Sequence, residues 1–297
     1  MCSPDLKPAL EDPRVLLSRY GLQPRRSLGQ NFLIDPMAPA RIAAGAELSL
    51  ADTVLEIGAG LGTLTGALLA RAGQVVAVET DPQLAAALQD VLGACANLRV
   101  VQGDILSLDP AALLAVTPVD TLPLWGARLE HYKVVANLPY YITAAVLRHI
   151  LEARVRPAIL VVTVQREVAE RMVAQPGDMS LLALSVQFYG KPRLLMRLKR
   201  GAFFPAPAVE SAVVRLDLYE TPPVAVDAVA DFFRVARAGF AQRRKQLRNT
   251  LAAELHLNPG AVAEALIGAG IDPTRRAETL ALPEWGRLVA ALHPWLE

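Results

Sequence analysis

The chain has 297 residues, of which 53% are hydrophobic, and its formal net charge is +1. This length allows one large domain or two modest ones with a sizeable hydrophobic core. Because the net charge is close to zero, no global field would hold the protein on nucleic acid, and any such binding must use local basic patches.

The first half of the sequence alternates strand-like and helix-like segments. The expected strands are residues 52–60, 74–81, 98–105, 132–139 and 157–165. The expected helices are residues 63–73, 82–94 and 144–153. Such alternation predicts an α/β fold with a doubly wound parallel sheet covered by helices on both faces. From about residue 219 the pattern becomes mostly helical, so we expect two domains, residues 1–219 and 220–297.

Ligands of a doubly wound sheet bind at the carboxyl ends of its strands. Four positions of this sequence fall there: the glycine-rich turn at 58–62, Glu79, Asp104, and the segment Asn137–Tyr140. The sequence therefore predicts one site to which four strands contribute.

The glycine-rich turn and two acidic residues favour one cofactor over another. Taken alone, the GxGxG turn that includes Gly58 and Gly60 is typical of any tight strand-to-helix connection. Glu79 ends the next strand, where a carboxylate can bind both hydroxyls of a ribose, as in sites for NAD or S-adenosylmethionine. The spacing is not GxGxxG, and Asp104 can accept from an adenine amino group, although alone Asp104 would be a helix cap. Together these features favour S-adenosylmethionine.

The segment Asn137–Tyr140 is suited to hold an amino group that receives a methyl group. An adenine amino group is a poor nucleophile. The Asn137 side-chain oxygen and the Leu138 carbonyl can each accept a hydrogen bond from one of its two N–H groups, which favours an ammonium-like transition state. Pro139 fixes the chain direction, and Tyr140 can stack on the base, a contact worth ~1–3 kcal/mol. Taken alone, the same residues are typical of a turn beside a buried tyrosine.

These motifs resemble those of the rRNA adenine N6,N6-dimethyltransferase family, in particular the branch that modifies small-subunit (16S) rRNA. The similar stretches cover nearly the whole chain in the family's order. They are SLGQNFLIDP (27–36), VLEIGAGLGTLT (54–65), VVAVETD (75–81), GDIL (103–106), VVANLPYYIT (134–143), FFPAPAVESAVVRL (203–216) and FAQRRKQLRNTL (240–251).

The resemblance implies a Rossmann-like class I methyltransferase domain (1–219) and a small helical domain that docks RNA (220–297). It implies S-adenosyl-L-methionine as cofactor and no metal. The implied reaction dimethylates two adjacent adenines in a hairpin loop near the 3′ end of small-subunit rRNA, during ribosome biogenesis. The implied partner is the small ribosomal subunit, and the protein is expected to act as a monomer.

The resemblance also implies roles for single residues. Gln30, Asn31 and Leu33 would close over the methionine end of the cofactor, and Phe203 would stack on the target adenine opposite Tyr140. The expected cofactor-binding residues are Gln30, Asn31, Leu33, Gly58, Gly60, Glu79, Asp104, Ile105 and Asn137. The expected catalytic residues are Asn137, Leu138, Pro139, Tyr140 and Phe203.

A basic cluster near residue 245 has two interpretations. It contains Arg243, Arg244, Lys245 and Arg248. Runs of charge are usually solvated surface, but the resemblance favours contacts with RNA phosphates, which give affinity without sequence information. One straight helix would place Arg244 beside an apolar stripe, so we expect a helix break at Gly239.

The protein is predicted to be cytoplasmic. Its N-terminus lacks the apolar core of a signal peptide, and its longest purely apolar stretches, such as 158–162, are far shorter than the ~20 residues of a membrane span. Cys2 and Cys95 show no metal-binding spacing and are expected to be reduced thiols.

Three alternatives stay open on the sequence. The first is a large-subunit rRNA dimethyltransferase of the macrolide-resistance type, which shares the catalytic core. The second is a non-catalytic ribosome-assembly or transcription-type factor, and the third, weaker alternative is an adenine DNA methyltransferase. Two stretches depart from the family pattern: 178–184, where the loop is expected to differ, and 107–132, which is long and rich in proline.

Overall fold

The computed structural model describes residues 11–114, 127–221, 223–224 and 229–296. Cys2, most of the N-terminal extension and the middle of the 107–132 stretch lie outside this part. The chain divides into two compact units. The first ends at Ala169 and resumes over Arg193–Leu218, while the second contains Glu170–Pro192 and the chain from Tyr219 onwards.

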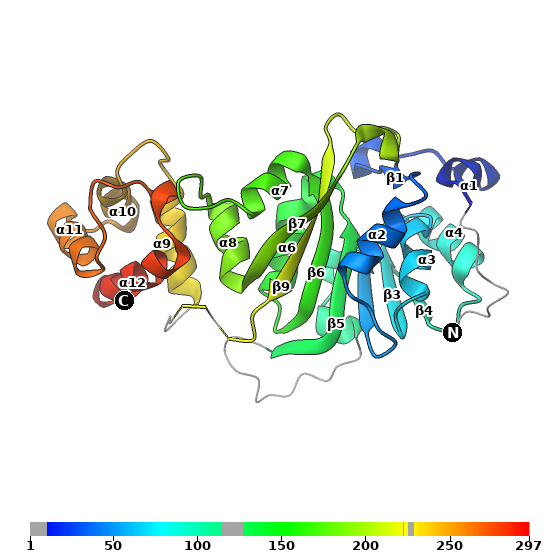
Figure 1. Ribbon diagram of the computed structural model, residues 1–297, viewed down its shortest axis with the longest axis horizontal. Helices are drawn as coiled ribbons and strands as arrows, with labels where there is room; N and C mark the ends of the chain where they lie inside the picture. The colour runs from blue at the N-terminus through cyan, green and yellow to red at the C-terminus, as the bar shows by residue number, and fades with distance from the viewer. Residues whose placement is uncertain (1–10, 115–126, 222, 225–228, 297) are drawn as a thin grey trace. The chain divides into compact units, whose positions relative to one another are not determined.

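The first unit is built on a mixed sheet of seven strands in the order β4-β3-β2-β5-β6-β9-β7 (Figure 1). The strands are β2 (Thr53–Ile57), β3 (Gln74–Glu79), β4 (Leu98–Gln102), β5 (Ala127–Asn137), β6 (Val155–Gln165), β7 (Gly190–Leu198) and β9 (Ser211–Leu218). Strands β2 to β6 pair in parallel, and β9 runs antiparallel to β6. The predicted α/β fold class is confirmed.

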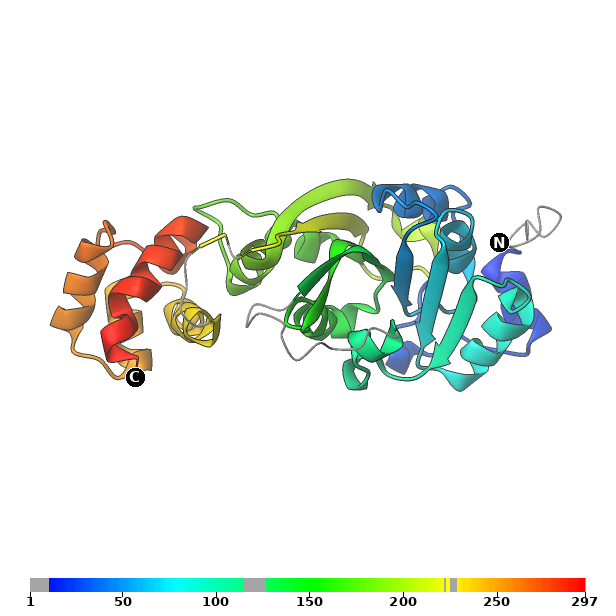
Figure 2. The same ribbon diagram turned by 90° about the horizontal axis from the view of Figure 1, so that it is seen from below.

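Helices cover both faces of this sheet (Figure 2). In the first part of the chain they are α1 (Pro13–Arg19), α2 (Ala38–Gly45), α3 (Thr63–Leu69), α4 (Pro82–Leu92), α5 (Pro110–Leu113), α6 (Thr143–Leu151) and α7 (Arg166–Met172). A short antiparallel pair, β1 (Phe32–Leu33) with β8 (Phe203–Phe204), lies apart from the main sheet. Helix α4 begins as predicted, with Pro82 in its first turn and Asp81 accepting a hydrogen bond of 3.0 Å from the Gln83 amide.

The order of the strands places a crevice between β2 and β5. From β2 the chain proceeds outward through β3 to β4, and from β5 it proceeds the other way to β6. The connections therefore diverge between β2 and β5, and in such sheets the ligand binds outside the carboxyl ends at this point. Ile57 pairs with Ala136 at these ends, so the glycine-rich turn and the Asn137–Tyr140 segment are neighbours.

Two predicted boundaries in the chain need correction. The helix expected over 63–73 ends at Leu69, and Gly73 instead allows close approach of the main chain, because a Cβ there would collide with the Leu50 carbonyl oxygen. The break expected at Gly239 lies after Phe240, where α9 ends. Six residues, 241–246, then separate α9 from the next helix, so the basic residues in that turn do not share the helix's apolar stripe.

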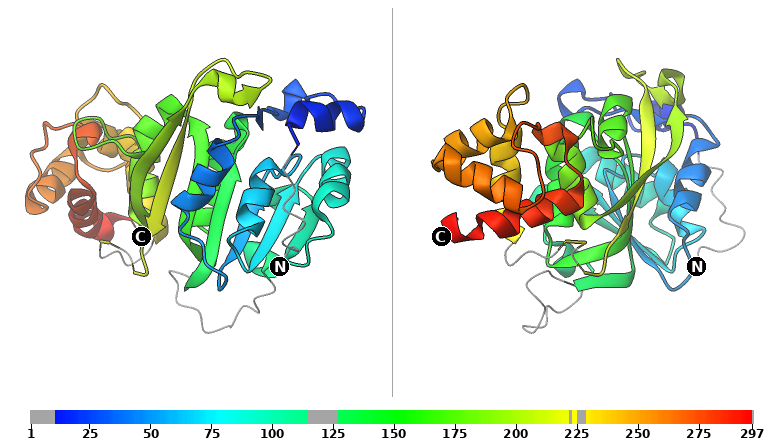
Figure 3. Two further views of the ribbon diagram at one scale, coloured as in Figure 1. Left: turned by 45° about the vertical axis from the view of Figure 1, so that its right-hand side comes forward. Right: turned by 60° about the vertical axis from the view of Figure 1, so that its left-hand side comes forward.

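Helices form most of the second unit, which also includes the first residues of β7. It contains α8 (Leu181–Tyr189), α9 (Val229–Phe240), α10 (Leu247–Leu255), α11 (Pro259–Gly268) and α12 (Leu282–Leu292), and Figure 3 shows the last four helices packed together. Phe188 of α8 stacks on Phe232 of α9 with ring centroids 4.3 Å apart. This contact explains why 170–192 group with the C-terminal helices, whereas one division near residue 219 was expected. The 178–184 stretch, expected to be a loop, leads into α8, whose first turn Ser180 caps.

Three further expectations concern the chemistry of the chain. Cys95 is disulfide-bonded and 4% exposed, so the expected reduced thiol is wrong at this position. Among the described residues, no helix is long and apolar enough to cross a membrane. The same part of the chain holds no group of three or more His, Cys, Asp or Glu side chains arranged for a metal ion.

Gly239 is a packing requirement that can be tested. A Cβ there would lie 2.5 Å from Cη2 of Trp285, which is fully buried, and 3.0 Å from Cδ1 of Leu247. We expect Gly239→Ala to lower the free energy of unfolding by ~1–3 kcal/mol because the ring must shift. Gly268→Ala is the matched control, since its Cβ would meet nothing within 4 Å, and it should stabilise helix α11 by ~0.5–1 kcal/mol. Urea unfolding of both variants measures the difference, and equal effects would contradict the packing argument.

Candidate active site

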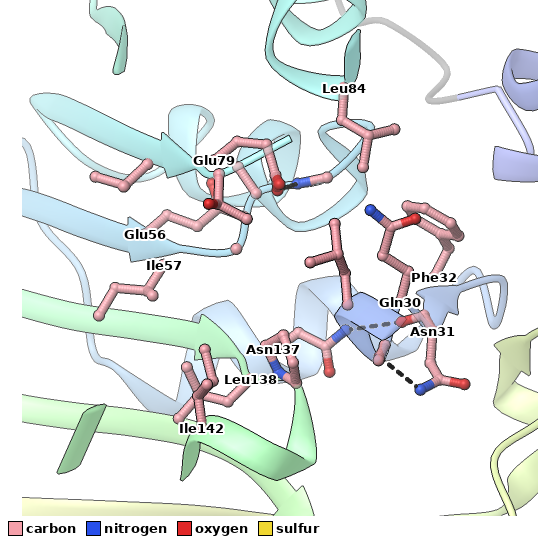
Figure 4. A pocket seen from close by; sticks show the side chains of 18 of the residues that line it. Gln30, Asn31, Phe32, Glu56, Ile57, Glu79, Leu84, Asn137, Leu138 and Ile142 are labelled. Atoms are coloured by element: carbon pink, nitrogen blue, oxygen red, sulfur yellow. Dashed lines mark hydrogen bonds between the residues drawn. The ribbon is translucent and has the colours of Figure 1, made fainter. Parts of the chain in front are cut away.

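A cavity of about 300 Å³ lies at the carboxyl ends of β2, β3 and β5 (Figure 4). The residues expected from the sequence to bind cofactor or act in catalysis all line it. They are Gln30, Asn31, Leu33, Gly58, Gly60, Glu79, Asp104, Ile105, Asn137, Leu138, Pro139, Tyr140 and Phe203. Residues from six separate segments of the first unit are thus brought to one place.

The glycine-rich turn approaches its neighbours closely. Gly58 and Gly60 have φ values of +73° and +57°, in the left-handed region that favours glycine. A Cβ at Gly60 would lie 3.3 Å from the Phe32 ring, and one at Gly58 would lie 3.8 Å from Pro139. At Gly60 the missing side chain lets the turn lie close to Phe32, whereas at Gly58 the positive φ rather than the available space favours glycine.

Glu79 is held in a fixed position at the end of β3. Its Oε2 accepts a hydrogen bond of 2.8 Å from the Gly60 amide, and its Oε1 accepts one of 2.9 Å from the Asp81 amide. The carboxylate is 5% exposed. Burial raises the pKa of Glu79, and the hydrogen bonds from the Asp81 and Gly60 amides oppose this rise. Each oxygen keeps a lone pair with which a ribose hydroxyl can bond.

Asp104 caps a turn and also faces the cavity. Its Oδ1 accepts a hydrogen bond of 3.0 Å from the Leu106 amide and so caps the 3₁₀ turn Ile105–Ser107. The side chain is also exposed at the cavity. Ile105, which is 4% exposed, adds an apolar contact to the same wall.

The covering segment, residues 28–31 just before β1, lies over the cavity. The side chains of its two amide residues hold it in place. The Gln30 side chain donates to Asp81 Oδ2 at 3.2 Å and accepts from the Arg25 amide at 2.8 Å. Asn31 Nδ2 donates to the Gly29 carbonyl at 2.9 Å. Both side chains thus organise the covering segment, and the Gln30 bond ties it to the N-terminus of α4.

Asn137 is oriented by that same segment. Its Nδ2 donates a hydrogen bond of 3.1 Å to the Asn31 carbonyl (Figure 4). This bond commits one donor of the amide and leaves Oδ1 as the acceptor. The neighbouring Leu138 amide donates to the Thr163 carbonyl at 3.3 Å, which fixes the end of β5 against β6.

Two aromatic residues lie at the cavity with different degrees of burial. The half-buried Tyr140 shares a hydrogen bond of 2.6 Å between its hydroxyl and that of Ser211. Burial raises the pKa of Tyr140, and the bond to Ser211 opposes the rise. Phe203 is only 3% exposed and pairs with Leu33 across the β1–β8 ribbon. Phe203 therefore forms part of the cavity wall.

One functional candidate, Glu56 on β2, was missed from the sequence. It lines the cavity and is 1% exposed, and neither carboxyl oxygen has a hydrogen-bond partner among the described residues. Burial raises the pKa of Glu56 to about 8, and the neighbouring Glu79 adds to this rise. The Thr65 hydroxyl opposes the rise in pKa, although Thr65 and Glu56 do not have the geometry of a hydrogen bond. A cationic ligand would pair with this carboxylate. S-adenosylmethionine, which carries ammonium and sulfonium charges, fits this requirement.

The basic cluster lies in the second unit. Arg243, Arg244 and Lys245 are exposed in the turn between α9 and α10, whereas Arg248 is half-buried in the first turn of α10. Arg248 lies 3.4 Å from Asn249 Oδ1 and 3.5 Å from Gln246 Oε1. Three of the four cations are thus open to a polyanion.

Residues 21–293 match the protein family described as ribosomal RNA adenine dimethylase. The chain is 47% identical over 275 residues to ribosomal RNA small subunit methyltransferase A of Dehalococcoides mccartyi, covering 93% of this chain and 90% of that protein. It is 46% identical over 281 residues to the protein of the same name from Moorella thermoacetica, covering 94% and 96%.

Two solved structures are similar over nearly their whole length. A dimethyladenosine transferase from Plasmodium falciparum has a TM-score of 0.72 at 23% identity, covering 89% of this chain and 98% of that one, and this likeness supports the fold alone. The 23S rRNA methyltransferase ErmE has a TM-score of 0.69 at 28% identity, covering 89% and 100%.

The unpartnered carboxyl group of Glu56 predicts a pH dependence of stability. The folded protein keeps this proton up to about pH 8, whereas an unfolded chain releases it near the ordinary value of 4.5. Rising pH between these values therefore favours unfolding, by up to ~1.4 kcal/mol per pH unit. Relative to Glu56→Gln, the wild-type free energy of unfolding should fall across this range and level off above it.

Denaturant unfolding of wild type and Glu56→Gln, from about pH 5 to about pH 9, measures this difference. Glu167→Gln, which removes an exposed carboxylate from α7, controls for the change in net charge. Stability curves of wild type and Glu56→Gln that stay parallel over the whole range would show that burial does not perturb Glu56.

Proposed function

Because the chain belongs to the ribosomal RNA adenine dimethylase family, we propose that it dimethylates the N6 amino groups of two adjacent adenines in a 3′-terminal hairpin loop of small-subunit (16S) rRNA. S-adenosyl-L-methionine is the methyl donor. One observation carries the proposal: the glycine-rich turn, Glu79, Asp104 and the Asn137–Tyr140 segment line a single cavity.

The choice of the small subunit rests on the relatives. Proteins that share 46% or 47% of their residues with this chain are named as small-subunit methyltransferases. The protein named as a 23S rRNA methyltransferase shares 28%.

Asn137 and Leu138 position the attacking amine. S-adenosylmethionine, when bound, supplies an electrophilic methyl group. Asn137 Oδ1, whose amide is oriented by the Asn31 carbonyl, accepts one N–H of the adenine amino group, and the Leu138 carbonyl accepts the other. These acceptors favour the positive charge that develops on the nitrogen as the bond from sulfur to the methyl group breaks. The methylated nitrogen then releases one N–H proton to solvent and becomes neutral again. Pro139 keeps the segment rigid.

Other residues of the cavity hold the cofactor and the base. Glu79 binds the ribose hydroxyls and Asp104 the adenine amino group of the cofactor, with Gly58, Gly60 and Ile105 beside them. Gln30, Asn31 and Leu33 enclose its methionine end. The target adenine leaves its stack, as bases do in other base-modifying enzymes, and lies between Tyr140 and Phe203.

The helical domain of residues 220–297 docks the RNA through the basic cluster Arg243, Arg244, Lys245 and Arg248. Their positive charges and the exposure of the first three support contacts with phosphates. The protein acts as a monomer in the cytoplasm, where its ribosomal substrate is assembled. One chain suffices because its own residues form the cavity.

Transfer of labelled methyl groups tests the function directly. Substrates are unmethylated small subunits, large subunits, naked rRNA and duplex DNA, and the modified nucleoside is identified by mass. We expect N6,N6-dimethyladenosine in small subunits. Label in large subunits would favour the resistance-type enzyme, and cofactor binding without transfer to any substrate would favour an assembly or transcription-type factor.

Asn137→Ala should lower the turnover of methyl transfer by ~10²–10³-fold, by analogy with the loss of one preorganised polar group in other active sites. The variant removes the side-chain acceptor for the amine but none of the proposed ribose or adenine contacts of the cofactor. The cofactor dissociation constant, measured by calorimetry, should rise by less than the turnover falls, because only the bond from Asn137 to the Asn31 carbonyl is lost on the cofactor side. Turnover equal to that of wild type would exclude Asn137 from the reaction.

Changing Arg243, Arg244, Lys245 and Arg248 together to Ala should weaken RNA binding and flatten its salt dependence. Each phosphate contact contributes ~0.7–0.9 to the slope of log affinity against log salt concentration. The matched control is Arg148→Ala, because Arg148 is exposed but paired with Glu152 at 3.0 Å. If the variant with all four residues changed and the Arg148→Ala control both show the wild-type slope of log affinity against log salt concentration, the cluster is ordinary solvated surface.

A further inference from the structure

Two consecutive tyrosines at the cavity have different surroundings. Both belong to the 3₁₀ turn Tyr140–Ile142, and both line the cavity. The Tyr140 hydroxyl is bonded to Ser211, whereas the Tyr141 side chain makes no hydrogen bond to any described residue and is 62% exposed. Ligand cavities are commonly lined by aromatic side chains, and the Tyr141 ring has no other polar partner among the described residues.

The covering segment leaves room for the Tyr141 ring. Gly29 has a φ of +59°, and a Cβ there would lie 3.2 Å from Cδ1 of Tyr141 and 3.4 Å from Cβ of Pro139. Any larger residue would therefore press on the ring and on the Pro139 turn. Gly29 thus allows Tyr141 to lie at the rim, between the covering segment and solvent.

We propose that Tyr141 is a positioning residue that stacks on the nucleotide adjoining the adenine held against Tyr140. The proposal rests on the proposed function, in which the substrate contains two adjacent adenines. Consecutive side chains of a 3₁₀ turn point about 120° apart. The Tyr140 hydroxyl reaches Ser211 whereas Tyr141 lies beside Gly29, so the two rings can contact two different bases. When one adenine is in the cavity, the other lies one nucleotide away, at the rim.

This arrangement gives the enzyme a way to recognise the pair. Unpaired RNA bases are commonly recognised by stacking on aromatic side chains, and every base offers a π-face for this contact. Tyr140 stacks on the adenine that reacts, and Tyr141 stacks on the adjoining base during that reaction. Removal of either the Tyr141 ring or the adjoining base should therefore cause the same loss, and removal of both should cost no more than one.

The test is a double-mutant cycle on the first methyl transfer. The proteins are wild type and Tyr141→Ala, and the substrates are unmethylated small subunits with either the normal adenine pair or an abasic residue beside the target adenine. Tyr141→Ala should lower kcat/KM by about 5- to 100-fold on the normal substrate, mainly through KM. On the abasic substrate the variant and wild type should be equal within about twofold.

Two variants control for structural damage. Tyr141→Phe keeps the ring and should match wild type on both substrates. Leu50→Ala removes a side chain that is 64% exposed elsewhere in the same unit, and it should have no effect. The dissociation constant for S-adenosylmethionine should be the same in all four proteins.

The outcomes separate this proposal from the function on which it rests. Equal losses for Tyr141→Ala on both substrates would overturn it, because the ring would then act through the fold rather than the adjoining base. No loss on the normal substrate would also overturn it. Wild-type protein that transfers no methyl group to small subunits would refute the proposed function itself, and the role of Tyr141 would be refuted with it.

Discussion

The site depends on the direct pairing of β2 with β5. Ile57 lies opposite Ala136 in this pair, so the glycine-rich turn that follows β2 must run beside the Asn137–Tyr140 segment that follows β5. The positive φ of Gly58 turns the chain away from the sheet at this point. Strand pairing thus sets the distance between the part of the cavity that binds a cofactor and the part that holds a base, before any ligand is present.

Much of this arrangement was predictable from the sequence, and the exceptions have physical causes. Strands such as β6 are buried on both faces and therefore read as continuous apolar runs. Strand β7 was missed because its exposed positions, which include Lys191 and Arg193, make it look like a basic patch. Glu56 was missed because its position inside a strand does not reveal its partners. The glycine-rich turn, Glu79, Asp104 and the Asn137–Tyr140 segment could be predicted from their places at strand ends. The other cavity residues, Gln30, Asn31, Leu33 and Phe203, were expected only from the family resemblance, and the burial of Phe203 depends on its pairing with Leu33.

Glu56 and Glu79 show how one cavity can treat two carboxyl groups differently. Both are buried, but Glu79 receives two main-chain amides and Glu56 has no hydrogen-bond partner among the described residues. The first is suited to accept from neutral hydroxyl groups, while the second gains most from a positive charge. A ligand with a ribose at one end and a cationic amino acid at the other matches both requirements, and S-adenosylmethionine is such a ligand.

If Asn137 and Leu138 accept from the substrate amine as proposed, these two acceptors also limit how many times one adenine can react. In the proposed arrangement Asn137 Oδ1 and the Leu138 carbonyl each accept a hydrogen bond from one N–H group of the amine. Each methyl transfer replaces one of these N–H groups by an N–CH₃ group. The monomethylated amine retains one N–H and can still be held, whereas the dimethylated amine retains none. The site therefore allows two methyl transfers to one adenine, because the substrate amine then has no hydrogen-bond donor left. The loss of both hydrogen bonds also favours release of the dimethylated base.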